Sequence, residues 1–300
     1  MTAYAGMSRD DAFTCRLNTD KLATVLGVDR TRLHGYLAVS SSGVPTVALC
    51  GHSILAGNLN VGRAAICTEC VEERGYVPAW FDLKVVDACP THRRQLVRMC
   101  THCQRGLNRL RPELLKCNCG ASLTGVLGAP IANEHAELLA YLVSKFNNGT
   151  PFASSYGMPA AWLSTMTLGR LVRLVDVLAS MHVAATRQRN VSNSQRAAKM
   201  LEQWPRNLYA AMNELIPDGS SGNGAALLRN HAEGVYRTWL SKVSAAPDIA
   251  FLRSALAGFE PGLAASTPTA LAIPEAFARP PTPAKGPDEP ALGKFCITRC

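Results

Sequence analysis

Residues Cys67–Leu123 read CTECVEERGYVPAWFDLKVVDACPTHRRQLVRMCTHCQRGLNRLRPELLKCNCGASL and hold seven of the eleven cysteines in this chain of 300 residues. These cysteines and one histidine form four close pairs, spaced C-x2-C, C-x2-H, C-x2-C and C-x-C. A close pair can bind one metal ion from a single tight turn, and two pairs supply the four ligands of tetrahedral zinc. A lone C-x2-C pair would also fit a redox dithiol, but four successive pairs predict metal binding.

The eight ligands predict two zinc ions in closed, structural sites, because a full set of four leaves no position for a reactive water. Spacing alone leaves open whether the two sites follow one another along the chain or interleave. Taken in chain order, the first site is Cys67, Cys70, Cys89 and His92, and the second is Cys100, Cys103, Cys117 and Cys119.

The zinc region is also the most basic part of a chain whose net charge is +9. Seven basic residues and one acid lie in Cys89–Gly128, which favours an anionic partner such as DNA. The alternative is a solvated surface. Three carboxylates upstream, Glu69, Glu72 and Glu73, are interpreted as surface residues. The candidate DNA contacts here are Arg93, Arg94, Arg98, Arg105, Arg109 and Arg111.

On the N-terminal side, Asn18–Ala38 contains two short stretches of apolar periodicity that Gly27 separates. Asp20 and Asp29 could cap the two helices that this pattern predicts. The arrangement resembles a helix-turn-helix, although an ordinary pair of helices has the same pattern. At the start of the second helix, where base-reading side chains would lie, the candidates are Arg30, Arg32 and His34.

On the C-terminal side the periodicity becomes helical. Apolar stripes predict helices over Glu134–Phe146, Leu168–Val183, Ser194–Leu215 and Ala225–Ser244, with Pro205 breaking the third after Trp204. Pro261–Cys300 is rich in proline without periodicity, which predicts a disordered tail.

The expected fold is therefore mostly α, with a small zinc-ribbon-like β region that includes a strand-like piece at Phe81–Asp87. The expected domains are an N-terminal helix-turn-helix-like region at 1–49, a double zinc region of tandem knuckles at 50–128, a helical domain at 129–260 and the tail at 261–300.

Several functional classes lack their sequence signatures. No window approaches 18 uncharged apolar residues, and no basic segment followed by an apolar one opens the chain, so we expect a cytoplasmic, nucleoid-associated protein with no membrane partner. Thiols stay reduced in the cytosol, so disulfides are not expected. H-E-x-x-H, G-x-S-x-G and G-x-G-x-x-G motifs do not occur, and we expect no enzymatic activity.

The stretch Cys67–Leu123 resembles the TniQ family of transposition proteins. The match continues in order from Leu17 to Phe259, through LGRLVRLVDVL at Leu168–Leu178 and the Trp204-Pro205 step. The Pro-rich opening and Ser-Trp helix of that family have no counterpart before Leu17, which predicts a shortened or divergent N-terminal unit. The matching positions of the zinc region are Cys67, Cys70, Glu72, Tyr76, Trp80, Cys89, Pro90, His92, Leu96, Cys100, Cys103, Cys117, Cys119, Gly120 and Leu123.

The resemblance implies a protein that selects the target site for a transposon. Such a protein binds DNA or, in some relatives, an RNA-guided complex, and recruits a transposition ATPase and through it the transposase. Two other classes compete with this interpretation. A RING-like or zinc-ribbon adaptor would bind proteins without DNA, although seven residues between His92 and Cys100 exceed RING spacing. A zinc-dependent nucleobase deaminase would need a His-x-Glu motif, which the sequence lacks.

Overall fold

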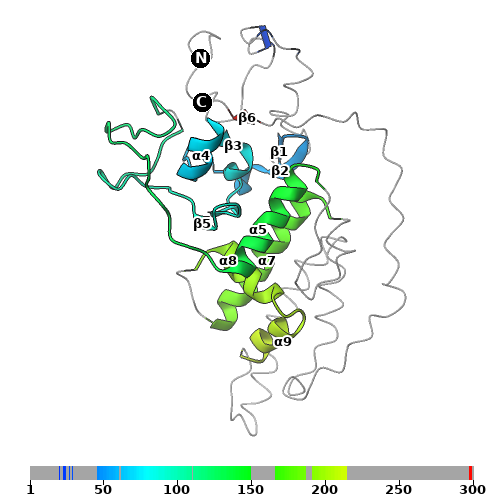
Figure 1. Cartoon of the computed structure of the whole chain (residues 1–300). Coiled ribbons are helices and arrows are strands. Elements are labelled where there is room, and N and C mark those ends of the chain that lie inside the picture. The colour runs from blue at the N-terminus through cyan, green and yellow to red at the C-terminus, as the bar shows by residue number, and fades with distance from the viewer. Residues whose placement is uncertain are drawn as a thin grey trace, which may run out of the picture. The chain divides into compact units, whose positions relative to one another are not determined.

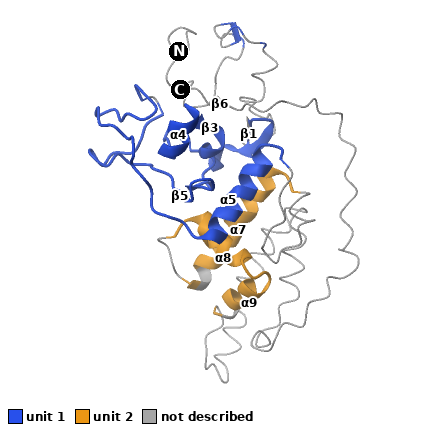
Figure 2. Ribbon diagram, viewed as in Figure 1, with its two compact units in different colours: residues 1–150, 293–300 blue, residues 151–292 orange. Residues whose placement is uncertain are grey.

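The computed structural model describes residues 46–60, 62–109, 111–149, 166–186, 191–214 and 297–298, together with positions 20, 23, 24, 27 and 29. In these residues the fold is helix-rich, with small antiparallel sheets (Figure 1). The chain divides into two compact units, Met1–Thr150 with Gly293–Cys300, and Pro151–Leu292 (Figure 2). The eight predicted metal ligands all belong to unit 1.

Unit 1 begins its described part with a hairpin of strands β1 (Thr46–Leu49) and β2 (His52–Leu55). Cys50 and Gly51 form the two-residue turn, both with positive φ, which suits the twist of a tight hairpin. Nε2 of His52 lies 2.9 Å from the carbonyl oxygen of Phe146, at the end of helix α5 (Asn133–Phe146). The hairpin is thereby tied to a helix almost a hundred residues later.

The rest of unit 1 is built from short elements. Helix α4 (Thr68–Arg74) ends at Gly75, whose φ of 71° is left-handed. Two-residue strands β3 (Val77–Pro78) and β6 (Ile297–Thr298) pair with each other, as do β4 (Ala88–Cys89) and β5 (Arg94–Gln95). Two 3-10 turns, η2 (Ala56–Asn58) and η3 (Ala79–Asp82), complete the set. The large side chains fully buried in unit 1 are Ile54, Ile66, Phe81, Leu83, Leu107, Leu123, Leu139 and Leu142.

Residues Gly128–Ile131 lie against the outer edge of β5. Gln95 donates its N–H to Ala129, Ile131 donates to Arg93, and Arg94 bridges Pro130. The approach is so close that a Cβ on Gly128 would lie 1.9 Å from the Gln95 carbonyl oxygen. This third, irregular strand brings the chain from the second ligand group back to the first, and α5 begins directly after it.

Unit 2 contains three described helices, α7 (Leu168–Thr186), α8 (Asn193–Leu201) and α9 (Arg206–Asn213). The α8 helix is capped by Ser192, whose hydroxyl accepts the Gln195 N–H. Both α8 and α9 contact α7, which buries an apolar stripe of Leu171, Val172, Leu174, Val175 and Leu178.

Most helices expected from periodicity are confirmed where the structure describes them. The stretch 134–146 corresponds to α5, the stretch 168–183 corresponds to α7, and Pro205 separates α8 from α9 as expected. The boundary between the compact units falls after Thr150, so α5 belongs to the same unit as the metal-ligand residues. The domain boundaries expected from the sequence stay a prediction.

The prediction of a strand at Phe81–Asp87 is wrong. Phe81 and Asp82 belong to η3, and the Leu83 and Val86 N–H groups bond to carbonyls three residues back. Phe81, Leu83, Val85 and Val86 are all buried, so apolar side chains fill the core from a series of turns rather than one face of a strand.

Other expectations fall largely outside the described residues. In the proposed helix-turn-helix only five positions are described: Asp20, Ala23 and Thr24 are helical, Gly27 is left-handed, and Asp29 is in neither a helix nor a strand. Arg30, Arg32 and His34 are not among them, nor is the helix expected at Ala225–Ser244. Of the expected tail, Ile297–Thr298 are described and form β6.

Replacing Gly128 with alanine is expected to destabilise unit 1 by about 1 to 3 kcal/mol, because the new methyl group would overlap backbone atoms of Gln95 that cannot rotate away. Gly57→Ala is the matched control, since a Cβ there meets nothing within 4 Å. Urea denaturation of both zinc-loaded variants would measure the effect, and equal midpoints would contradict this account of the Gly128–Ile131 strand.

Candidate metal centres

The structure brings the eight predicted ligands together as two groups of four. Within each group all ligand atoms lie within 4.8 Å of one another. The groups follow one another along the chain, so the interleaved arrangement of a RING does not occur here. Their members are Cys67, Cys70, Cys89 and His92 in the first group and Cys100, Cys103, Cys117 and Cys119 in the second.

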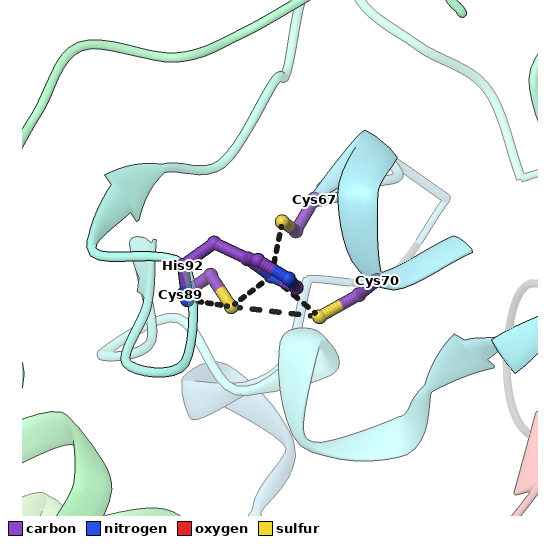
Figure 3. A group of neighbouring side chains, drawn as sticks. All are labelled: Cys67, Cys70, Cys89 and His92. Carbon is purple, nitrogen blue, oxygen red and sulfur yellow. Dashed lines mark hydrogen bonds between the residues drawn. The ribbon is translucent and has the colours of Figure 1, made fainter. Parts of the chain in front are cut away.

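In the first group, three sulfur atoms surround Nδ1 of His92 (Figure 3). This nitrogen lies 3.3 Å from Sγ of Cys67, 3.3 Å from Sγ of Cys70 and 3.5 Å from Sγ of Cys89. The sulfur atoms of Cys70 and Cys89 are 3.5 Å apart. The ring is therefore oriented with one nitrogen toward the thiols.

These distances fit a tetrahedral zinc ion. Bonds of about 2.3 Å to sulfur and about 2.0 Å to nitrogen place two sulfur ligands about 3.8 Å apart, and a sulfur and a nitrogen about 3.5 Å apart. The second group agrees equally well, with 3.8 Å between Cys100 and Cys119 and 3.8 Å between Cys103 and Cys117. Each group could thus hold one zinc ion with little movement of its side chains.

Short antiparallel pairings present three of the four ligand pairs at hairpin tips. Cys89 is the last residue of β4, and His92 lies in the turn between β4 and β5. The Met99–Gly106 bridge encloses the third pair, and the Lys116–Ser122 bridge encloses the fourth. In each case the residue after the second ligand has a left-handed backbone. Those residues are Arg93 with φ 53°, Gln104 with φ 54° and Gly120 with φ 89°.

The first pair is built differently, on helix α4. Cys67 precedes the helix at its N-cap position and Cys70 lies in its first turn. The N-terminus of a helix favours negative charge, which suits thiolate ligands. Both sulfurs are buried, as is that of Cys89.

Hydrogen bonding in the first group already favours one thiolate. Hydrogen bonds from the thiols of Cys67 and Cys70 lower the pKa of Cys89 to about 2, and the backbone N–H of His92 adds to them at 3.4 Å from Sγ. The pKa of Cys70 is raised because its thiol interacts with Cys67 and Cys89 and is buried. In the second group, backbone N–H groups of Cys103 and His102 lower the pKa of Cys100 to about 6.

Glu73 supports the histidine ligand from outside the first group. Nε2 of His92 lies 2.9 Å from Oε1 of Glu73, so the ring donates on one side while Nδ1 faces the sulfurs on the other. Such a carboxylate fixes the tautomer and orientation of a metal-binding histidine. The sequence alone suggested a surface residue here, but the position of Glu73 one helical turn after Cys70 on α4 is the signal that could have identified it.

The other two carboxylates of α4 also have internal partners. Oε2 of Glu69 lies 3.7 Å from Nε of Arg94, and Glu72 accepts the N–H of Gly125 at 3.3 Å. Nearby, Thr68 donates its hydroxyl to the Val126 carbonyl at 2.8 Å. Helix α4 therefore holds the segment Gly125–Val126 by hydrogen bonds, and its carboxylates contact protein groups as well as solvent.

The six candidate arginines of the zinc region differ in their exposure and in their hydrogen-bond partners. Arg93 and Arg105 are exposed, and Arg93 donates to Oδ1 of Asn133, which is also exposed. Arg94 and Arg98 are half-buried and donate to the carbonyls of Gly128 and Val86. Arg109 pairs with Asp82 and donates to the Asn60 carbonyl. Arg111 is buried and donates to the carbonyls of Asn108 and Leu114. The hydrogen bonds of Arg109 and Arg111 thus serve the fold itself.

Two further expectations concern thiols and membranes. Cys50 is disulfide-bonded, which corrects the expectation of no disulfides, while the eight-ligand region contains only free thiols. Among the described residues no helix has the length and apolar character needed to cross a membrane.

Comparison of the chain with protein-family models and with curated proteins gives no match. The resemblance to TniQ proteins consequently stays a prediction from the sequence. The geometry and chemistry of the two ligand groups, and of the residues around them, are what indicate a function.

Purified chain is expected to contain two zinc ions, and Cys70→Ser or Cys103→Ser should each remove one, because serine is a poor zinc ligand. Since binding energy at such a site is folding energy, each loss should also loosen the local fold. Elemental analysis measures the zinc. The control is His102→Ala, an exposed residue between two ligands, which should keep both ions. One or no zinc ion in unmodified chain would refute the two-site assignment.

Removing the carboxylate in Glu73→Ala is expected to weaken zinc binding at the first group by about 10- to 100-fold, since His92 loses its orienting partner. Glu73→Gln should have a smaller effect because an amide oxygen can still accept from Nε2. Competition with a zinc chelator measures the affinity. Glu113→Gln, an exposed carboxylate paired with Lys116, is the control, and an effect as large as that of Glu73→Ala would contradict the assignment.

Proposed function

We propose that this protein is a zinc-stabilised DNA-binding adaptor that selects target sites in a transposition system and recruits a transposition ATPase and transposase. The observation that carries the proposal is the pair of four-ligand groups at the positions that resemble TniQ proteins. On this proposal the hairpin tips are tandem zinc knuckles. Both zinc ions are structural, because each group already offers four ligands and no open position.

The role of the zinc ions is to hold basic side chains in place on short loops. Arg93 follows His92, and Arg105 lies two residues after Cys103, so each is fixed close to a ligand pair. Both are exposed, and a guanidinium in that position can contact a phosphate oxygen. Phosphate contacts supply salt-dependent affinity for DNA of any sequence. Reading of bases is assigned to the region of Arg30, Arg32 and His34.

The remaining arginines have supporting roles in this proposal. Arg94 and Arg98 are half-buried, with hydrogen bonds to backbone carbonyls, so their replacement would disturb the loops as well as any phosphate contact. Arg109 and Arg111 brace the loop between the third and fourth ligand pairs, and Arg109 ties that loop to Asp82 and Asn60. A test of DNA binding is therefore sharpest at Arg105 and at Arg93, whose hydrogen bond is to Asn133, another exposed side chain.

A double variant, Arg93→Gln with Arg105→Gln, is expected to bind DNA more weakly. Its salt dependence should be reduced by about 0.9 log units of slope for each phosphate that the variant no longer neutralises. Fluorescence anisotropy with a labelled duplex, over a series of salt concentrations, measures both quantities. The control is Arg173→Gln with Arg206→Gln, which removes the same two charges from exposed positions on α7 and α9 of unit 2.

The outcomes separate the proposal from its rival. If the salt dependence of DNA binding has the same slope for all variants, these arginines do not contact phosphates and form a solvated surface. A chain that holds two zinc ions, shows no salt-dependent DNA binding and still retains a transposition ATPase would be a zinc-ribbon adaptor that acts through proteins alone.

A further inference from the structure

We propose that the second ligand group is an oxidation site, at which a peroxide oxidises Cys119, Cys100 completes a disulfide, and the capacity to hold zinc is lost, while the first group resists. The inference rests on the proposed zinc binding at both groups and is independent of DNA. It arises from a difference in exposure and ligand type between two groups of otherwise similar geometry.

The two groups differ first in access. Cys119 is exposed and Cys103 is half-buried, at the ends of hairpin tips. In the first group Cys67 is 4% exposed, and Cys70 and Cys89 are completely buried. A small oxidant in water can therefore reach a sulfur of the second group directly, whereas a sulfur of the first group becomes accessible only when α4 or the β4–β5 hairpin moves.

The groups differ also in chemistry. Four thiolates around one zinc ion carry a net charge of −2, and three thiolates with a neutral imidazole carry −1, so sulfur in the second group is the more electron-rich nucleophile. In addition, all four ligands of the second group can enter disulfides. His92 cannot, and it would remain available to zinc after any loss in the first group.

The distances define which thiols react. Sγ of Cys119 attacks one oxygen of hydrogen peroxide: an S–O bond forms, the O–O bond breaks, and the departing hydroxide takes a proton to become water. Sγ of Cys100, 3.8 Å away, then attacks this sulfenic acid: an S–S bond forms, the S–O bond breaks, and a second water leaves. The two sulfurs supply the two electrons that reduce the peroxide.

The product keeps only Cys103 and Cys117 as thiolates, too few to hold zinc firmly. Their sulfur atoms are also 3.8 Å apart, so a second equivalent of peroxide can join them in the same way. Both disulfides connect the third ligand pair with the fourth. Oxidation would consequently link the two hairpin tips covalently in place of the metal.

The test begins with full-length chain that contains two zinc ions by elemental analysis. Hydrogen peroxide is added, and a chromogenic zinc indicator follows the release. We expect one of the two equivalents to be released while the other stays, and mass spectrometry of proteolytic fragments to find Cys100 joined to Cys119. Cys67, Cys70 and Cys89 should remain open to alkylation after denaturation.

Two variants locate the entry point. Cys119→His keeps a nitrogen ligand for zinc but removes the exposed thiol, so peroxide-dependent release should become slower and depend on the half-buried Cys103. His102→Ala, an exposed neighbour that is no ligand, should behave as the unmodified chain. If Cys119→His fails to retain two zinc ions, brief alkylation of the unmodified zinc-loaded chain decides the matter, since Cys119 must then be the first of the seven ligand cysteines to be labelled.

The possible outcomes test this inference separately from the proposed zinc binding on which it rests. Fewer than two zinc ions before peroxide would refute the metal assignment and this inference together. Two ions that are both retained, or both released at one rate, would overturn the inference alone. A disulfide within the first group, or alkylation of Cys70 as early as Cys119, would do the same.

Discussion

The convergence of Cys67, Cys70 and Cys89 on Nδ1 of His92 joins parts of the chain that have few other means of staying together. Strands β4 and β5 are two residues long, and an isolated hairpin of that size is not stable in water. Helix α4 has seven residues, fewer than an independent helix needs. Zinc binding at such a site contributes about 10 to 16 kcal/mol in small zinc-dependent domains. On the proposed zinc binding, such an energy would offset the entropy of ordering these short elements.

From this group the connections extend to the rest of unit 1. Arg93, directly after the histidine ligand, donates to Asn133 at the start of α5, and His135 in the first turns of α5 meets Asp87 at 3.0 Å. The residues of Gly128–Ile131 run along β5 between them. The first group is thus connected to α5 by direct contacts, and α5 is connected through Phe146 to His52 on β2.

The sequence predicted the ligands well and their surroundings poorly, for a physical reason. Ligand spacing is a local property, since C-x2-C already fixes a turn that can bind one ion, and apolar periodicity is equally local to α5 and α7. The partners of Glu73 and Arg109 lie 19 and 49 residues away in the sequence. The spacing of Glu73 after Cys70 is a local signal of its role, whereas no local pattern distinguishes Arg109 from a solvated charge. The prediction of a strand at Phe81–Asp87 was wrong because a series of buried turns produces the same short apolar run as a buried strand.

The net charge of the zinc region is also lower when its cysteine ligands are counted as thiolates. The net charge of +9 counts every cysteine as neutral. With one zinc ion in each group, the first contributes −1 and the second −2, so the loaded chain carries about +6. Arg94 and Arg98 already have partners in the fold, Arg94 in Glu69 and the Gly128 carbonyl and Arg98 in the Val86 carbonyl. On the proposed DNA binding, the positive charge that remains for a phosphate lies on exposed side chains such as Arg105. Exposure, rather than the local density of arginine, is accordingly what decides which residues of this region can bind a phosphate.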